Sequence, residues 1–276
     1  MNRAKVMTPG RWVIWTLLVA GGIVMVFPVY WMFATAFAPK GSLLDGTLRL
    51  WPPRLTLDNL RAAWQTQPLA RWAVNTTIIA VVSVTITVII SLLAGYAFAK
   101  YRFRGRGVLF FAILLTIMVP IQVIMVPEFL IVARLNLVGT LWAVILPRAA
   151  EGIAIFISRQ FMLAIPDELI ESARIDGANE LTVFRRVVLP LCGPLIGVLV
   201  ILAFVFRWND FIWPLVALKG QENFTLPLGL ASMHGTFNSP IEAIMAVSAL
   251  SMVPVMLVFV VFQRRFVQGI ASTGLR

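Results

Sequence analysis

Charged residues, cysteine and histidine are scarce in this sequence of 276 residues. Only 13% of the residues are charged, whereas 60% are hydrophobic and the mean hydropathy is +0.90. A soluble domain of this length needs far more polar surface, so the composition indicates a protein embedded in membrane lipid. The single cysteine, Cys192, excludes an internal disulfide and a cysteine-based metal site. The single histidine, His234, excludes a histidine metal cage, and no H-E-x-x-H zinc motif occurs.

Long runs without charge cover most of the chain. A helix needs about 20 residues to cross roughly 30 Å of hydrocarbon. We therefore predict an all-α, polytopic membrane protein with one domain over residues 1–276. Six transmembrane helices are expected, at about 12–37, 72–99, 107–127, 138–160, 187–213 and 243–263. The first run is too long for a signal peptide and is interpreted as a membrane anchor. The fourth contains Arg148 and Glu151, which would lie three residues apart on one helical face and neutralise each other.

The distribution of basic residues predicts the orientation. With both termini in the cytoplasm, the cytoplasmic segments are 1–11, 100–106, 160–186 and 264–276, and these carry more than half of the 23 Lys and Arg residues. Membrane topology thus accounts for the net charge of +11, and nucleic-acid binding is not expected. The outer segment 38–71 does not follow this distribution, because it holds five basic and two acidic residues. It is expected to form a partly structured external lobe.

The segment 166–190, before the fifth predicted span, has its own helical signals. Pro166 suits the first turn of a helix, and Asp167 and Glu168 suit its positive N-terminal end. Gly177 would end this helix in a left-handed conformation, and Asn179 would cap a second helix that continues into the fifth span. A connection of about 25 residues with mixed charge is predicted to dock against a partner; the alternative is a solvated loop.

The same segment resembles a known motif. Glu171-Ser172-Ala173, three residues, Gly177, nine residues and Val187-x-Leu189-Pro190 resemble the E-A-A–G–I-x-L-P loop of binding-protein-dependent ABC importer permeases. Ser172 and Val187 replace the usual Ala and Ile and conserve size. Further segments are similar to the carbohydrate branch of that family, of the maltose/glycerol-phosphate type: residues 52–59, 75–77, 94–105, 208–215 and 263–269. The resemblance covers nearly the entire chain.

The resemblance implies a type I importer fold and a permease subunit that forms half of the pathway for a sugar or sugar-like solute. The implied location is the cytoplasmic membrane of a bacterium or archaeon. The implied partners are a second permease, two ATP-binding subunits and an extracytoplasmic solute-binding protein. The first part of the loop would be a cytoplasmic coupling helix, and the residues implied to couple the chain to the ATPase are Glu171, Ser172, Ala173, Asp176, Gly177, Leu189 and Pro190.

The chain has no G-x-x-x-x-G-K-[ST] loop, so ATP and Mg would be bound by the partner ATPase, and no cofactor or catalytic residue is expected here. The C-terminal residues Gln263, Arg264 and Arg265 either reach the ATPase, as the resemblance allows, or are ordinary positive-inside residues.

Polar residues within the predicted spans are candidates for the solute pathway, because polar groups in lipid normally face protein or a watery cavity. These candidates are Asn75, Gln122, Trp208, Asn209 and Asp210. Helix packing and an interfacial aromatic belt are the alternative interpretations. A subunit of a secondary active transporter remains the alternative function. Sugars of any length, polyols and glycerophosphodiesters are all compatible with the resemblance.

Overall fold

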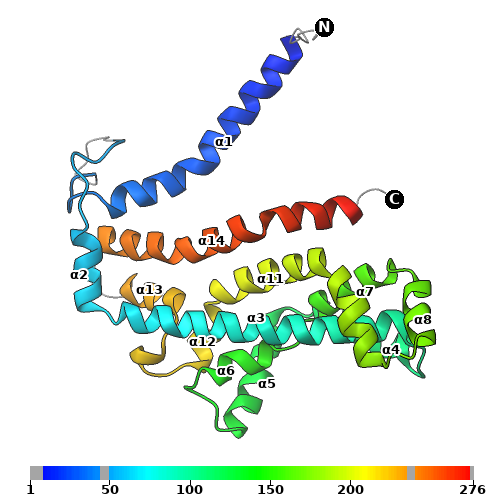
Figure 1. Ribbon diagram of the computed structural model, residues 1–276. Coiled ribbons are helices and arrows are strands. Elements are labelled where there is room, and N and C mark those ends of the chain that lie inside the picture. The colour runs from blue at the N-terminus through cyan, green and yellow to red at the C-terminus, as the bar shows by residue number, and fades with distance from the viewer. Residues whose placement is uncertain (1–8, 44–49, 235–239, 274–276) are drawn as a thin grey trace. The chain divides into compact units, whose positions relative to one another are not determined.

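The computed structural model describes residues 9–43, 50–234 and 240–273, and within these ranges the chain forms helices and no β-strand. This agrees with the all-α prediction. The longer helices are α1 (Pro9–Ala36), α3 (Leu69–Lys100), α4 (Arg106–Met118), α5 (Ile121–Arg134), α7 (Gly152–Leu163), α11 (Gly193–Trp208) and α14 (Ile241–Thr273) (Figure 1). The shorter elements are α2 (Asp58–Thr66), α6 (Trp142–Ile145), η1 (Leu146–Arg148), α8 (Asp167–Ile175), α9 (Glu180–Val183), η2 (Phe184–Val188), α10 (Leu189–Leu191), α12 (Ile212–Ala217), η3 (Gln221–Asn223) and α13 (Leu226–His234).

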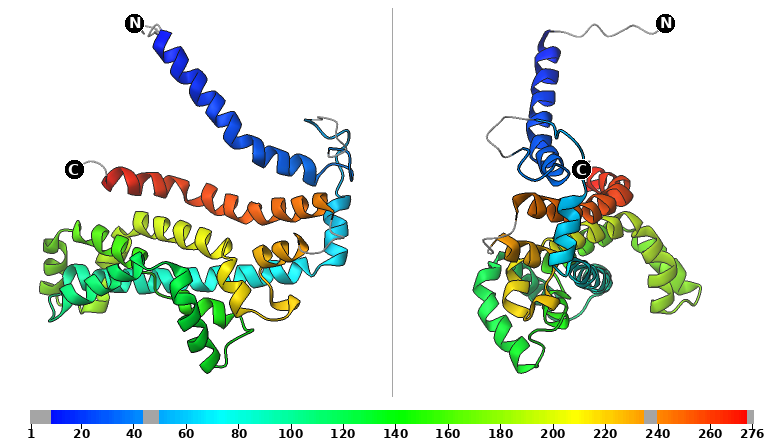
Figure 2. Two further views of the ribbon diagram at one scale, coloured as in Figure 1. Left: turned by 180° about the vertical axis from the view of Figure 1, so that it is seen from behind. Right: turned by 90° about the vertical axis from the view of Figure 1, so that its left-hand side faces the viewer.

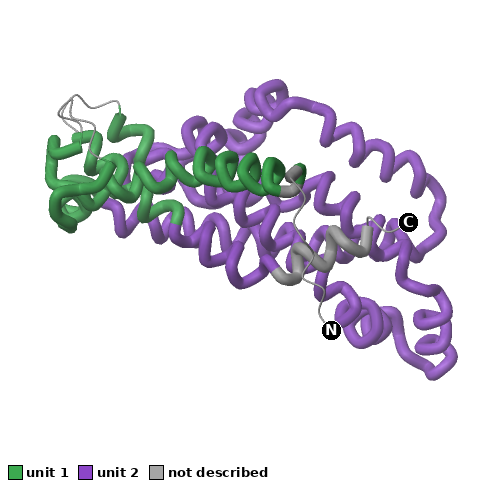
Figure 3. The backbone as a smooth tube through the Cα atoms, turned by 90° about the horizontal axis from the view of Figure 1, so that it is seen from above, with its two compact units in different colours: residues 1–67, 230–252 green, residues 68–229, 253–276 purple. Residues whose placement is uncertain are grey.

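The chain divides into two compact units, which Figure 3 distinguishes by colour. Unit 1 comprises residues 1–67 with 230–252, and unit 2 comprises residues 68–229 with 253–276. In unit 1, the side chain of Asn59 on α2 donates hydrogen bonds to the carbonyl oxygens of Ala36, at 3.0 Å, and Ala38, at 2.7 Å. These bonds satisfy backbone acceptors that the end of α1 leaves without a helical partner. The segment 38–71, predicted to be external, therefore includes the helix α2, which is held by the buried amide of Asn59.

Unit 2 is built around α3, along which α7 and α11 pack (Figures 1 and 2). The close approach of α7 depends on Gly95, because a Cβ atom there would lie 2.5 Å from the Cβ atom of Ser158. Small residues at such crossings let membrane helices approach closely. At the N-terminal end of α3, Trp72 donates to the carbonyl of Gln221 at 2.8 Å, and the hydroxyl of Thr76 accepts from the backbone N–H of Leu226 at 2.8 Å. The long helix α3 thus binds the segment 221–226.

Three helices are long and apolar enough to cross a membrane, namely Trp12–Ala36, Leu69–Lys100 and Ile241–Gln263. Two bent pairs add up to two further crossings within the described residues: α4 with α5, bent by 107°, and Glu180–Leu191 with α11, bent by 78°. Six crossings remain a prediction. The first bend has a local cause, since Pro120 forces the preceding Val119 into an extended conformation. At the second, Pro194 lacks the N–H that would bond to the carbonyl of Pro190.

The fourth predicted span, 138–160, is not one helix. It consists of α6, η1 and α7, with Glu151 in an extended conformation between them. Pro147 cannot donate to the carbonyl of Ala143, and the indole N–H of Trp213 donates to that oxygen instead, at 2.9 Å. The carbonyl of Arg148 accepts from the hydroxyl of Thr87 at 3.2 Å. Side chains from neighbouring elements therefore donate hydrogen bonds to the backbone carbonyls at this interruption, as an apolar environment requires.

The predicted pairing of Arg148 with Glu151 is wrong. The helix is interrupted between these two residues, so their side chains do not share one helical face and each pairs with another residue. The guanidinium of Arg148 contacts the carboxylate of Glu128 on α5 at 3.2 Å. Glu151 instead pairs with Arg207 at the end of α11. Arg207 also donates to the carbonyl of Arg148 at 3.3 Å, so these four residues form one network, here called the break network.

Candidate functional site

The loop 166–190 forms the short helix α8 where the sequence predicts it. Pro166 precedes the first residue of α8, and Asp167 and Glu168 occupy its first turn. Gly177 follows the helix with φ +83°, a left-handed conformation that glycine adopts without strain. Beyond it, the side chain of Asn179 accepts a hydrogen bond from the backbone N–H of Thr182 at 2.9 Å, which caps α9. The predicted start, end and second cap are all confirmed.

The N-terminal end of α8 is bound to the C-terminal end of α3. The ammonium group of Lys100 donates to the carbonyl oxygen of Ile165 at 2.5 Å and to Oδ1 of Asp167 at 2.6 Å. The side chain of Lys100 is only 6% exposed, although the carboxylate of Asp167 faces solvent. The hydrogen bond and charge of Lys100 lower the pKa of Asp167 below its usual value, so this carboxylate stays ionised.

The C-terminal end of α8 is linked through Glu180 to Tyr101, the residue that follows α3. The guanidinium of Arg174 contacts both carboxylate oxygens of Glu180, at 2.8 and 3.2 Å. The phenol of Tyr101 donates to the same carboxylate. Burial and this hydrogen bond raise the pKa of Tyr101, so the phenol stays protonated and remains a donor.

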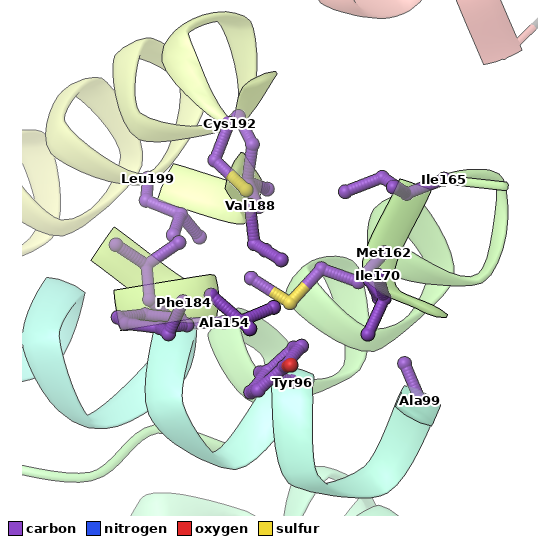
Figure 4. Packing of buried hydrophobic residues seen from close by; sticks show 13 residues of the cluster. Tyr96, Ala99, Ala154, Met162, Ile165, Ile170, Phe184, Val188, Cys192 and Leu199 are labelled. Atoms are coloured by element: carbon purple, nitrogen blue, oxygen red, sulfur yellow. The ribbon is translucent and has the colours of Figure 1, made fainter. Parts of the chain in front are cut away.

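One face of α8 is buried in a hydrophobic cluster (Figure 4). Ile170 is buried together with Tyr96 and Ala99 of α3, Met162 of α7 and Val183 of α9. Figure 4 shows these side chains, apart from Val183, converging with Phe184, Val188 and Cys192 from the segment that leads into α11, and with Leu199 of α11. The cluster therefore packs α8 together with α3, α7, α9, η2 and α11 of unit 2.

The other face of α8 is exposed and carries apolar side chains. Ile175 is 86% exposed, and Leu181, just beyond the turn, is 63% exposed. Of the predicted ATPase-coupling residues, Glu171, Ser172, Asp176 and Gly177 are exposed, whereas Ala173 is half-buried against the cluster. Leu189 and Pro190 lie in α10, where Leu189 also packs against the cluster. Ile175 therefore stands exposed among the polar residues Glu171, Ser172 and Asp176.

The structure places the five predicted pathway residues in different surroundings. The amide of Asn75 is buried and donates to the carbonyls of Glu222, at 2.9 Å, and Phe224, at 3.0 Å. Trp208 is buried, Asp210 is half-buried, and Gln122 and Asn209 are exposed. Asn75 thus binds the segment 221–226 rather than standing free in an open space.

The C-terminal residues are only partly described. Gln263 is exposed and donates to the carbonyl of Val260 at 3.1 Å. Arg264 and Arg265 continue α14, but their side chains lie outside the described part of the structure.

Two groups of residues escaped the sequence reasoning. The first is the break network, whose partners are far apart in sequence. The second is Lys100 and Tyr101, which read as ordinary residues of a basic turn. Their only local signal was position: both directly follow a long apolar run and precede a short turn.

Comparison with known proteins gives a consistent result. Residues 87–272 match the family model described as "Binding-protein-dependent transport system inner membrane component". The chain is 37% identical over 256 residues to the arabinooligosaccharides transport system permease protein AraQ of Halalkalibacterium halodurans, covering 92% of each chain. It is 31% identical over 267 residues to the sn-glycerol-3-phosphate transport system permease protein UgpE of Shigella flexneri, covering 94% of this chain and 95% of the relative.

A solved structure shares the fold. It is described as a bacterial ABC transporter involved in the import of the acidic polysaccharide alginate, and its matching chain gives a TM-score of 0.84 at 23% identity. The match covers 96% of this chain and 99% of that one. From the matched family model and the two curated relatives, the chain belongs to the family of binding-protein-dependent transport system inner membrane components.

Proposed function

We propose that this chain is a permease subunit of an ABC importer, that it forms half of the pathway for a sugar or sugar-like solute, and that α8 receives the movement of an ATPase subunit. The observation that carries the coupling role is the two-sided character of α8. Its inner side is fixed by Ile170 in the cluster and by polar contacts at both ends. Its outer side presents Ile175 and the carboxylate of Glu171 to solvent.

The outer side has the chemistry of a docking surface. An apolar side chain in the middle of a ring of polar groups is the usual arrangement at the centre of an interface. Glu171 and Asp176 would meet basic groups of the partner, and Ser172 leaves room for its backbone to approach. The remaining subunits of the proposed assembly are a second permease, a second ATPase and an extracytoplasmic solute-binding protein.

The solute class is supported by the relatives, whose names specify arabinooligosaccharides and sn-glycerol-3-phosphate. Both solutes carry more than one hydroxyl group. Gln122 and Asn209 are the pathway candidates that are exposed in this structure, and the amide nitrogen of Asn209 donates to the carbonyl of Val205 at 2.9 Å. Side-chain amides can pair with hydroxyls as donors and as acceptors. In the proposed orientation both termini lie in the cytoplasm, and residues 263–265 lie on the ATPase side.

The test is purification of the whole complex with a substituted α8. Ile175→Asp and Glu171→Ala should reduce the amount of ATPase subunit that co-purifies by about tenfold or more, since a central interface residue carries much of the binding energy. Leu135→Asp, at a residue 60% exposed but distant in the chain from α8, is the matched control and should leave co-purification unchanged. Undiminished co-purification with both α8 variants would refute the coupling role.

The solute is tested separately by binding measurements on the cognate solute-binding protein. Tight binding of a carbohydrate or a polyol derivative is expected. Binding of only an amino acid, a peptide or a metal ion would refute the proposed solute class.

A further inference from the structure

Both ends of α8 are attached to two successive residues at the end of α3. Lys100 binds the beginning of α8 through Asp167 and the carbonyl of Ile165, at 2.6 and 2.5 Å. Tyr101 binds the other end through Glu180, which in turn holds Arg174. Neither contact is needed to form α8 itself, because Pro166 and Gly177 set the two ends of this helix through their own backbone preferences. The contacts therefore determine how α8 is oriented against α3.

The apolar contact in the middle of α8 cannot do this alone. Ile170 packs against Tyr96 and Ala99 of α3, and such contacts are non-directional. Ala173 of α8 also packs against this cluster, but a helix held by apolar contacts alone can still shift along them. Hydrogen bonds require short distances and near-linear geometry, so polar contacts on both sides of Ile170 remove that freedom.

The covalent path from α8 to the membrane helices is more easily deformed than the path through its contacts with α3. On the C-terminal side the path runs through the π-helix η2 and then through the 78° bend before α11. By contrast, α3 contains no proline and runs unbroken for 32 residues, or about 48 Å at about 1.5 Å per residue. A push on α8 is transmitted with less deformation through α3 than through η2.

The far end and the middle of α3 have polar contacts of their own. Trp72, Asn75 and Thr76 bind the segment 221–226, and Thr87 binds the carbonyl of Arg148 in the break network. A displacement of α3 therefore acts on both places. A continuous chain of packed and hydrogen-bonded groups of this kind can carry coupling between distant sites.

We propose that Lys100 and Tyr101 are positioning residues of transport, forming a clasp that makes α8 and α3 move as one body. This inference rests on the proposed coupling role of α8. Lys100 and Tyr101 touch neither the solute nor ATP; they decide how much of the movement of α8 reaches the membrane-spanning part of unit 2.

The experiment uses the complete complex in proteoliposomes and measures solute molecules imported per ATP hydrolysed. Lys100→Met combined with Tyr101→Phe should lower this ratio by about tenfold, in line with the loss of charge-assisted hydrogen bonds, while the ATPase still co-purifies. Lys100→Arg keeps the cation and should retain the ratio within about twofold. Arg104→Met removes an exposed cation of the same turn and should leave the ratio unchanged. A wild-type ratio in the double variant overturns the clasp.

A gain-of-function measurement covers the case in which the double variant fails to assemble. In a Cys192→Ala background, Lys100→Cys with Asp167→Cys should import poorly per ATP. A short bifunctional thiol reagent that joins the two cysteines should restore most of the ratio, because it replaces the clasp covalently. Import that stops on cross-linking would show that α8 must move relative to α3, and would overturn the inference.

The two proposals fail in distinguishable ways. If α8 does not receive the ATPase, Ile175→Asp leaves co-purification unchanged. If only the clasp is wrong, Ile175→Asp still reduces co-purification of the ATPase, while Lys100→Met with Tyr101→Phe leaves the import ratio unchanged.

Discussion

The break network and the clasp are both sets of ion pairs in unit 2, but they differ in their surroundings. In the break network, the side chain of Arg207 is 4% exposed and that of its partner Glu151 is 20% exposed. In the clasp, Lys100 is buried, with a side chain 6% exposed, but its partner Asp167 is 72% exposed, and Arg174 and Glu180 are 39% and 48% exposed. Buried charges are costly unless paired, whereas exposed pairs contribute little to folding.

This difference separates stability from transport. The break network lies where backbone is interrupted between η1 and α7 and at the end of α11, and it holds those interruptions in place. The clasp, by contrast, orients α8, a helix that would form without these contacts. We therefore expect substitutions in the break network to unfold the protein and substitutions in the clasp to uncouple it.

The largest effect is expected for Glu151→Leu, which leaves the guanidinium of Arg207 buried without its carboxylate. The loss of stability should be about 3–5 kcal/mol, measured by thermal unfolding in detergent. Adding Arg207→Met to this variant should recover most of the loss, since neither charge then remains. If the single and double variants are equally stable, the pairing does not hold the break.

A smaller loss is expected for Trp213→Phe. Without the indole N–H, the carbonyl of Ala143 that Pro147 leaves free has no donor, at a cost of about 1–3 kcal/mol. Trp12→Phe changes a 61% exposed tryptophan and serves as the control in the same unfolding assay. Equal melting temperatures for the two variants would contradict the assigned role of Trp213.

Gly177→Asp should cost about 1 kcal/mol of stability, because an L-residue must adopt a left-handed conformation there. Uptake should be abolished at normal expression, since the turn after α8 is displaced. Gly105→Asp is the matched control: its φ is +81° and, as at Gly177, an added Cβ meets nothing within 4 Å. Loss of uptake in both variants alike would attribute the effect to backbone strain alone.

The smallest effect on folding is expected for Asp167→Asn, which should not change the melting temperature but should lower import per ATP. Lys100 lowers the pKa of Asp167, so the ion pair contributes above the usual aspartate pKa of about 3.9 and is lost only as pH falls through the lower folded value. The wild-type import ratio should therefore show no titration of this pair between pH 8 and 5. A wild-type ratio for Asp167→Asn would remove Asp167 from the clasp.

The sequence predicts the features of the fold that depend on local signals. Pro166, Gly177 and Asn179 specify the limits of α8 and the start of α9 wherever the loop is placed. The long apolar runs likewise predict α1, α3 and α14. The interruption at Pro147 was visible as a residue type, but the sequence does not show which side chain satisfies the freed carbonyl.

Partners distant in sequence could not be predicted in the same way. Arg148 and Glu151 are three residues apart, which favours pairing only in a continuous helix. Because the backbone breaks between them, their partners are set by the packing of α5 and α11. Lys100 was counted as one more cytoplasmic charge, since its contact with Ile165 depends on how α8 folds back onto α3.

The central claim, that the outer face of α8 meets the ATPase, is tested most directly by cross-linking in the assembled complex. Cys192 is buried, so Cys192→Ala gives a cysteine-free background in which Ile175→Cys is the only thiol of this chain. A short bifunctional reagent should join Ile175→Cys to an ATPase subunit and should leave Leu135→Cys unjoined. Cross-linking from residue 135 with none from residue 175 would contradict the account.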